Sequence, residues 1–60
     1  MRITLDGQQI TKEAAYDRIM ELMPNGGTQF LDNAISVGVE HGTESLTIHV
    51  GTKSTLVIEF

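Results

Sequence analysis

Two histidines and two glutamates carry the side chains most often found around metal ions. Glu40, His41 and Glu44 lie in one short polar stretch, and His49 follows on an expected strand. Imidazole nitrogens and carboxylate oxygens bind divalent ions when they converge on one point. The spacing here matches neither a zinc site nor an EF-hand. We therefore expect surface polar residues, with no metal and no cofactor bound.

Three serines are the candidates for nucleophilic catalysis, because the chain has no cysteine. A serine becomes a nucleophile only beside a positioned base. Ser36, Ser45 and Ser54 lie on or beside expected strands, and none belongs to a nucleophile-elbow motif. Gly26-Gly27 lacks the lysine and the hydroxyl residue of a phosphate-binding loop. The sequence thus predicts that the chain is not an enzyme.

Carboxylates dominate the charged surface. The formal net charge is −4, and no Lys or Arg occurs between Arg18 and Lys53. An acidic surface favours a basic protein partner, whereas the shortage of Lys and Arg disfavours direct binding to nucleic acid. The alternative is that mild acidity only keeps a small protein soluble. The candidate residues for binding a basic partner are Glu13, Asp17, Glu21, Asp32, Glu40 and Glu44.

One amphipathic helix is expected to position the first three of these acids. Thr11 is a suitable N-cap, and Pro24 with the following Asn25-Gly26-Gly27 ends the helical pattern. This predicts a helix over residues 12–23. Its apolar stripe, spaced i, i+4, i+7 and i+8, is Ala15, Ile19, Leu22 and Met23. Glu13, Asp17 and Glu21 point away from that stripe and repel one another.

The other segments alternate apolar and polar residues, as β-strands do. Asp6-Gly7 and the stretches 41–44 and 51–53 are expected turns. Pairing Val39 with Leu46, and Val50 with Ser54, gives the sheet one apolar face. Residues 28–34 fit a loop or one helical turn. The expected strands cover residues 2–5, 35–40, 46–50 and 55–60.

These elements predict one α+β domain over residues 1–60. A single helix packs on one face of a four-stranded, mostly antiparallel sheet, in the chain order β-α-β-β-β. No apolar run approaches the roughly 20 residues of a membrane span, so we expect a soluble cytoplasmic protein. A chain this short buries only about 60% of its unfolded surface. Without cysteine it has no disulfide, and self-association or the binding of a partner is the remaining way to add stability.

Three residues are candidates for self-association into a homodimer. Gly38 lies within an expected strand, where glycine marks a bend or the close approach of another chain. Val57 and Phe60 belong to the last expected strand, whose edge can pair with another strand. Gly38 and Val57 are also expected on the uncovered face of the sheet, together with Thr47, His49 and Thr55.

Part of the chain resembles the barstar family of ribonuclease inhibitors. The opening Ile3-Thr4-Leu5-Asp6-Gly7, then Ile10 and a helix, is similar to the start of that family. Gly27, Leu31-Asp32 and Ala34 resemble its Gly…Leu-Asp-Ala segment, and Leu46-Thr47-Ile48 its next strand. The chain departs from the family at Asn25, Gly26 and Ser36, and it has no tryptophan. The resemblance implies that Asp32 contacts a nuclease.

The leading hypothesis is a small acidic protein-binding module that inhibits or regulates a larger partner with a basic surface. Inhibitors of nucleic-acid enzymes from phages and mobile elements have this size and charge. One alternative is a structural homo-oligomer assembled through strand edges, and the other is a barstar-like ribonuclease inhibitor.

Overall fold

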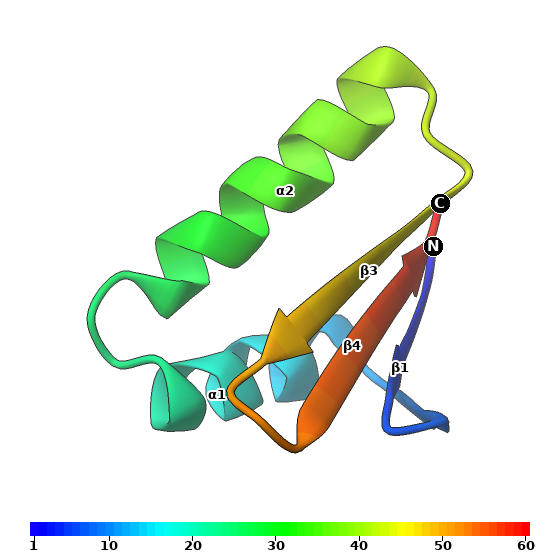
Figure 1. Ribbon diagram of the computed structural model, residues 1–60. Coiled ribbons are helices and arrows are strands. Elements are labelled where there is room, and N and C mark those ends of the chain that lie inside the picture. Colours follow the sequence, from blue (N-terminus) through cyan, green and yellow to red (C-terminus); the bar gives the residue numbers. More distant parts are fainter.

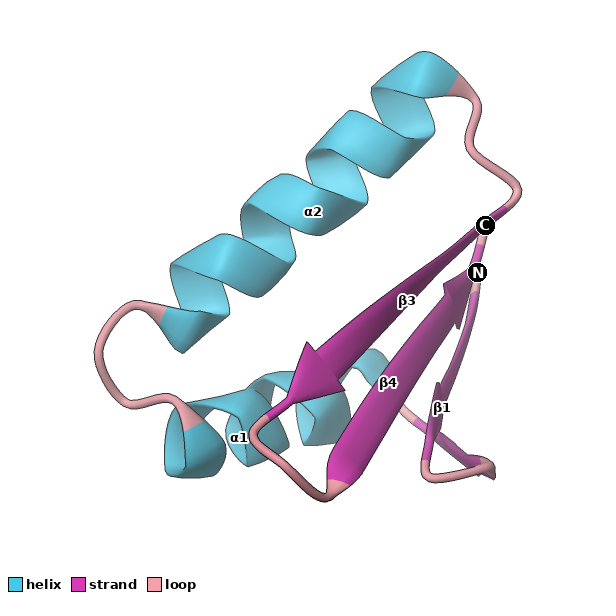
Figure 2. Ribbon diagram, in the orientation of Figure 1, coloured by secondary structure: helices cyan, strands magenta, loops and turns pink.

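Two helices lie on one face of a four-stranded antiparallel sheet in the computed structural model, which describes residues 1–60 (Figure 1). The sheet order is β2-β1-β4-β3, so β2 and β3 are the edges and β4 is central. The α+β class and the antiparallel sheet agree with the prediction (Figure 2). The elements are β1 (Arg2–Leu5), β2 (Gln8–Ile10), α1 (Lys12–Leu22), α2 (Gly27–His41), β3 (Ser45–Val50) and β4 (Ser54–Glu59).

The first hairpin turns at Asp6-Gly7, as predicted. Both residues have positive φ angles, 52° and 85°, which is the requirement of a two-residue type I′ turn. Asp6 also connects the hairpin to β4, because its N–H donates to the Thr55 carbonyl and its Oδ1 accepts from the Thr55 N–H, each at 2.9 Å. β1 thus pairs with β4 on one side, and the short strand β2 pairs with β1 on the other.

Helix α1 begins where the sequence predicted and ends one residue earlier. The Thr11 hydroxyl accepts a hydrogen bond from the Ala14 N–H at 3.0 Å, which satisfies a free donor of the first turn. At the other end the Met23 N–H donates to the Ile19 carbonyl at 2.7 Å. Pro24 follows, and a proline cannot continue a helix interior.

Residues 27–41 form α2, so the predicted strand over 35–40 is wrong, as are its pairing with 46–50 and the single-helix arrangement. The fourth strand is β2 instead. Leu31, Ile35 and Gly38 recur at helical spacing and are buried on the sheet side of α2. Burial of this helical face outweighs the β-preference of the branched residues in the same segment.

The predicted turn at 41–44 is the end of α2. Gly42 adopts a left-handed conformation, with φ 67°, and Thr43 donates its N–H to the Gly38 carbonyl at 2.9 Å. This is the usual glycine C-cap of an α-helix. A glycine that closes a helix and a glycine in a hairpin turn give the same local signal, which is why the segment resembled a hairpin.

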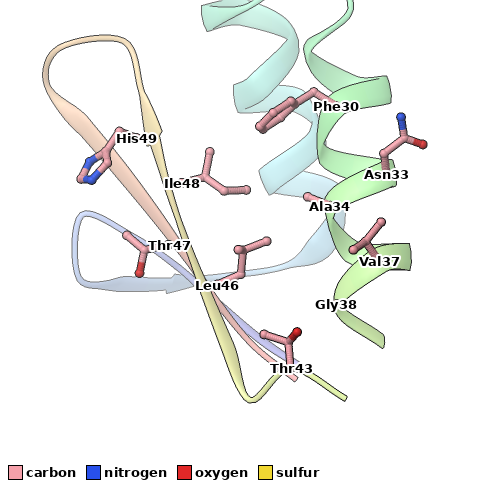
Figure 3. A pocket seen from close by; sticks show the side chains of 10 residues that line it. All are labelled: Phe30, Asn33, Ala34, Val37, Gly38, Thr43, Leu46, Thr47, Ile48 and His49. Carbon is pink, nitrogen blue, oxygen red and sulfur yellow. The ribbon is translucent and has the colours of Figure 1, made fainter. Parts of the chain in front are cut away.

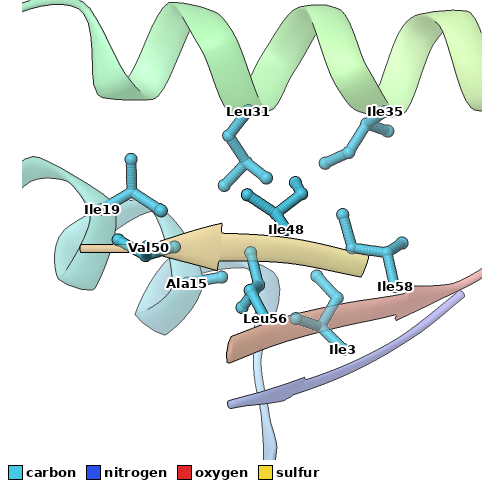
Figure 4. Packing of buried hydrophobic residues seen from close by; sticks show 9 residues of the cluster. All are labelled: Ile3, Ala15, Ile19, Leu31, Ile35, Ile48, Val50, Leu56 and Ile58. Carbon is cyan, nitrogen blue, oxygen red and sulfur yellow. The ribbon is translucent and has the colours of Figure 1, made fainter. Parts of the chain in front are cut away.

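The predicted β3–β4 register is correct, with Leu46 opposite Ile58, Ile48 opposite Leu56 and Val50 opposite Ser54. One side of the sheet faces both helices, and the other side carries Thr47, His49, Thr55 and Val57. Gly38, which was expected on that outer side, is instead in α2. Figure 4 shows the buried core, which comprises Ile3, Ala15, Ile19, Leu31, Ile35, Ile48, Val50, Leu56 and Ile58.

Candidate protein-binding site

A groove of about 540 Å³ lies between α2 and the edge strand β3 (Figure 3). The α2 wall is formed by Phe30, Ala34 and Val37, which are spaced i, i+4 and i+7 along the helix. The β3 wall is formed by Leu46 and Ile48, whose side chains point toward α2. The lining contains no Asp, Glu, Lys or Arg, and its other members are Asn33, Gly38, Thr43, Thr47 and His49.

Two large apolar side chains remain exposed on the α2 wall. Phe30 is 48% exposed and Val37 is 52% exposed, although both stand beside a hollow that could accept them. An apolar surface next to a concave, uncharged wall is characteristic of a site that binds another molecule. Neither residue was predicted from the sequence as part of a site, and only their spacing relative to Ala34 could have indicated them.

The free edge of β3 adds unpaired backbone groups to the groove. The Phe60 N–H donates to the Glu44 carbonyl at 3.0 Å, which fixes how the β3–β4 ladder alternates. In an antiparallel ladder, alternate residues direct their backbone groups to opposite sides. Leu46 and Ile48 therefore direct theirs to β4. The outer groups belong to Ser45, Thr47 and His49.

The two edges of the sheet differ in how well they are protected against pairing. β2 has three residues, and very short edge strands are a common protection. β3 has six residues and contains no proline, Lys, Arg, Asp or Glu. A smaller hollow of about 450 Å³ near β2 has two cations, Arg2 and Lys12, in its lining. The β3 edge is thus the one open to another strand.

The predicted acidic residues are all exposed, and none of them lines the groove. Glu13, Asp17 and Glu21 lie along α1, where Glu21 pairs with Arg18 at 3.0 Å. Glu40 lies in the last turn of α2, and Glu44 precedes β3. Asp32 lies on α2 and accepts a hydrogen bond from the Tyr16 hydroxyl at 2.9 Å.

The three residues predicted for self-association do not form an accessible edge. Gly38 is buried in α2, where the Phe60 ring lies against it, and an added Cβ would collide with that ring. Val57 belongs to β4, which pairs with β1 on one side and β3 on the other. Phe60 is half-buried against the core. The prediction of an edge at the last strand is wrong, because β4 is central.

The hydrogen bond between Tyr16 and Asp32 connects the two helices. It also makes the free energy of unfolding depend on pH in the alkaline range. Partial burial, then the hydrogen bond to Asp32 and its negative charge, raise the pKa of Tyr16 above its ordinary value of 10.0. The native state therefore holds the phenolic proton more tightly than the unfolded state does. Its stabilising contribution is complete below pH 10 and is lost as the pH rises through the raised pKa.

We expect Tyr16→Phe to lower the free energy of unfolding by about 0.5 kcal/mol at neutral pH, since the lost hydrogen bond is exposed. Above pH 10 the free energy of unfolding should fall less in this variant than in the wild type, because the ionising phenol is gone. Tyr16 is the only tyrosine, so its tyrosinate absorbance can be titrated directly. Asp32→Asn should move the pKa back toward 10.0. A wild-type titration already at the ordinary value would contradict the prediction.

Metal-binding side chains do not converge anywhere in the chain. No group of three or more His, Asp or Glu residues is placed to hold an ion. His41 ends α2, while His49 lies on β3.

Neither helix is long and apolar enough to cross a membrane. Comparison of the chain with protein-family models, curated proteins and solved structures finds no match.

Proposed function

We propose that the chain is a protein-binding module that takes an extended strand of another polypeptide at β3 and thereby regulates or inhibits a larger partner. The observation that supports this is the combination of a free, uncharged strand edge with the apolar groove beside it. Strand addition of this kind uses main-chain hydrogen bonds for affinity and side-chain pockets for specificity.

The geometry indicates what the added strand must offer. Its backbone would pair with the outward groups of Ser45, Thr47 and His49. Alternate side chains of a strand point to opposite faces, so every second one would enter the groove toward Phe30 and Val37. An alternating apolar and polar segment fits both requirements.

The acidic surface favours a partner with a basic surface around its strand. Acidic residues on α1 and α2 lie outside the groove and stay accessible when a strand is bound. Charges in this position accelerate association more than they increase affinity. Enzymes that act on nucleic acid have such basic surfaces, which suits an inhibitor of phage or mobile-element type. The barstar-like alternative depends on Asp32, which is exposed but already bonded to Tyr16.

The decisive test compares two valines on the same helix. Val37 lines the groove, whereas Val39 is 64% exposed and does not. For a partner isolated from the native host, we expect Val37→Glu to weaken binding at least about tenfold, since a carboxylate would be desolvated in an apolar groove. Val39→Glu introduces the same charge and should leave binding unchanged. Equal effects of the two variants would refute the groove as the binding site.

The contribution of the acidic face has a separate kinetic test. Asp17→Lys should slow association with that partner and reduce its dependence on ionic strength, while the dissociation rate stays similar. Glu59→Lys makes the same change of charge at an exposed acid outside the predicted set. Stopped-flow measurements at several salt concentrations compare the two. Identical association rates for both variants would remove the acidic face from the proposal.

A further inference from the structure

The β3 strand is complementary to itself. Its sequence, Ser45-Leu46-Thr47-Ile48-His49-Val50, contains no Lys, Arg, Asp or Glu, so pairing with its own copy brings no like charges opposite each other. Ser45, Thr47 and His49 provide three outward N–H groups and three outward carbonyls. An antiparallel pair of identical strands can satisfy all of them at once.

One register uses every free group. With Thr47 opposite Thr47 of a second copy, Ser45 lies opposite His49 of that copy, and three facing residue pairs can exchange hydrogen bonds. Shifting the two-fold axis to Ile48 places Thr47 opposite His49 and leaves Ser45 without a strand partner. Registers that mix the two faces of the sheet would expose apolar residues. The Thr47 register is therefore favoured.

The same register fills the groove. Leu46 of one copy then faces Ile48 of the other. Within each copy both side chains point toward α2 (Figure 3). These side chains would occupy the space beneath Phe30 and Val37, the two large apolar residues of the groove that are left exposed. Each α2 would cover its neighbour's edge strand, so the apolar lining of the groove in both copies is removed from water.

Charge placement agrees with this arrangement. In the Thr47 register Glu44 lies opposite Val50 of the second copy, where the turn to β4 begins. Lys53 is in that turn, and it is the only cation of the chain between Arg18 and its end. Glu44 of each copy thus approaches the turn that contains Lys53 of the other. The acidic residues of α1 are not among those lining the groove.

We infer that the groove is occupied by a second copy of the chain, in a two-fold dimer with a continuous sheet of both copies' strands and Thr47 on the axis. This inference rests on the proposed function, because it names the strand that the same site accepts. It adds a mode of regulation, since a larger partner must displace the second copy to reach β3. The dimer is the closed form and the monomer is the binding-competent form.

A matched pair of proline variants tests the dimer by sedimentation over a dilution series. Thr47 lies within the edge strand β3 and Gln9 within the edge strand β2, and each directs its backbone N–H away from the sheet. Proline at such a position spares the native sheet but prevents further pairing. We expect a wild-type dimer whose dissociation constant rises at least about tenfold in Thr47→Pro and does not change in Gln9→Pro.

A cysteine pair tests the register without disturbing the fold. The chain has no cysteine, so Thr47→Cys introduces a single thiol. Cα atoms of facing residues in a hydrogen-bonded pair are about 5.5 Å apart, which suits a disulfide. Thr47→Cys should form a covalent dimer rapidly on oxidation. Ser45→Cys should do so slowly, because the two substituted residues would be four residues out of register, about 13 Å apart.

Three results would overturn the inference: a monomeric wild-type chain at every concentration, equal weakening by Thr47→Pro and Gln9→Pro, or crosslinking of Ser45→Cys as fast as Thr47→Cys. The proposed function is tested separately from the dimer. If the chain is monomeric but Val37→Glu still abolishes partner binding, the strand-accepting groove remains and only the second copy is excluded as its occupant.

Discussion

Leu31→Ala is expected to lower the free energy of unfolding by about 2–5 kcal/mol. The Leu31 side chain is fully buried and reaches from α2 into the core formed with Ile48 and Ile58 (Figure 4). Removing it leaves a cavity that the surrounding isoleucines, held by sheet pairing, cannot fill. A core of this size rarely provides more than about 3–5 kcal/mol, so the variant should be largely unfolded.

Urea denaturation followed by circular dichroism, at one protein concentration, measures this loss. The matched control is Val39→Ala on the same helix, which should cost less than about 0.5 kcal/mol because Val39 is exposed. The pair also tests α2 itself. If residues 35–40 were a strand paired with β3, Val39 would face the core, and Val39→Ala would be as damaging as Leu31→Ala.

Gly27→Ala is the second substitution with a large expected effect, a loss of about 1–3 kcal/mol in the free energy of unfolding. Gly27 is buried in the first turn of α2, directly against α1. An added Cβ would lie 2.6 Å from the Met23 Cβ and 2.8 Å from the Ile19 Cγ2. The Met23 Cβ is fixed by the backbone, and the Ile19 side chain is held in place by the core around it, so the two helices must separate.

The neighbouring glycine provides the control. Gly26 has a φ of 89° and open space around it, so its requirement is conformational and not steric. Gly26→Asn should be tolerated, because asparagine accepts the left-handed conformation better than most residues. Thermal denaturation of the two variants separates these causes. A gain in stability for Gly27→Ala, as helix propensity alone would predict, would show that α1 and α2 do not pack closely here.

Much of the fold depends on local signals and could be read from the sequence. The Asp6-Gly7 turn, the Thr11 cap, α1 and the β3–β4 register each depend on residues close together in the chain. A type I′ turn needs positive φ angles that asparagine, aspartate and glycine supply, and a one-residue slip in the last hairpin would turn its apolar residues to the wrong face. Another turn conformation or another register would therefore cost too much free energy to be populated.

The site was less predictable than the fold. The exposure of Glu13, Asp17 and Glu21 followed from their spacing. The groove could not be predicted, because Phe30 and Val37 belong to a segment whose residues fit both a helical and a strand period. Ile35, Val37 and Val39 alternate as in a strand, while Leu31, Ile35 and Gly38 follow a helical face. No local property of these residues distinguishes the two patterns.

The sequence by itself determined the elements whose geometry is dictated by neighbouring residues: the Asp6-Gly7 turn, one capped helix, the β3–β4 hairpin and a single apolar face on the sheet. Only the tertiary structure decided that residues 27–41 form a second helix, since Leu31 and Ile35 are buried on residues distant in the chain and Gly38 leaves room for Phe60. That choice moved β4 to the centre and left β3 as an open edge beneath α2. The candidate site therefore exists only because long-range packing outweighed the β-preference of this segment.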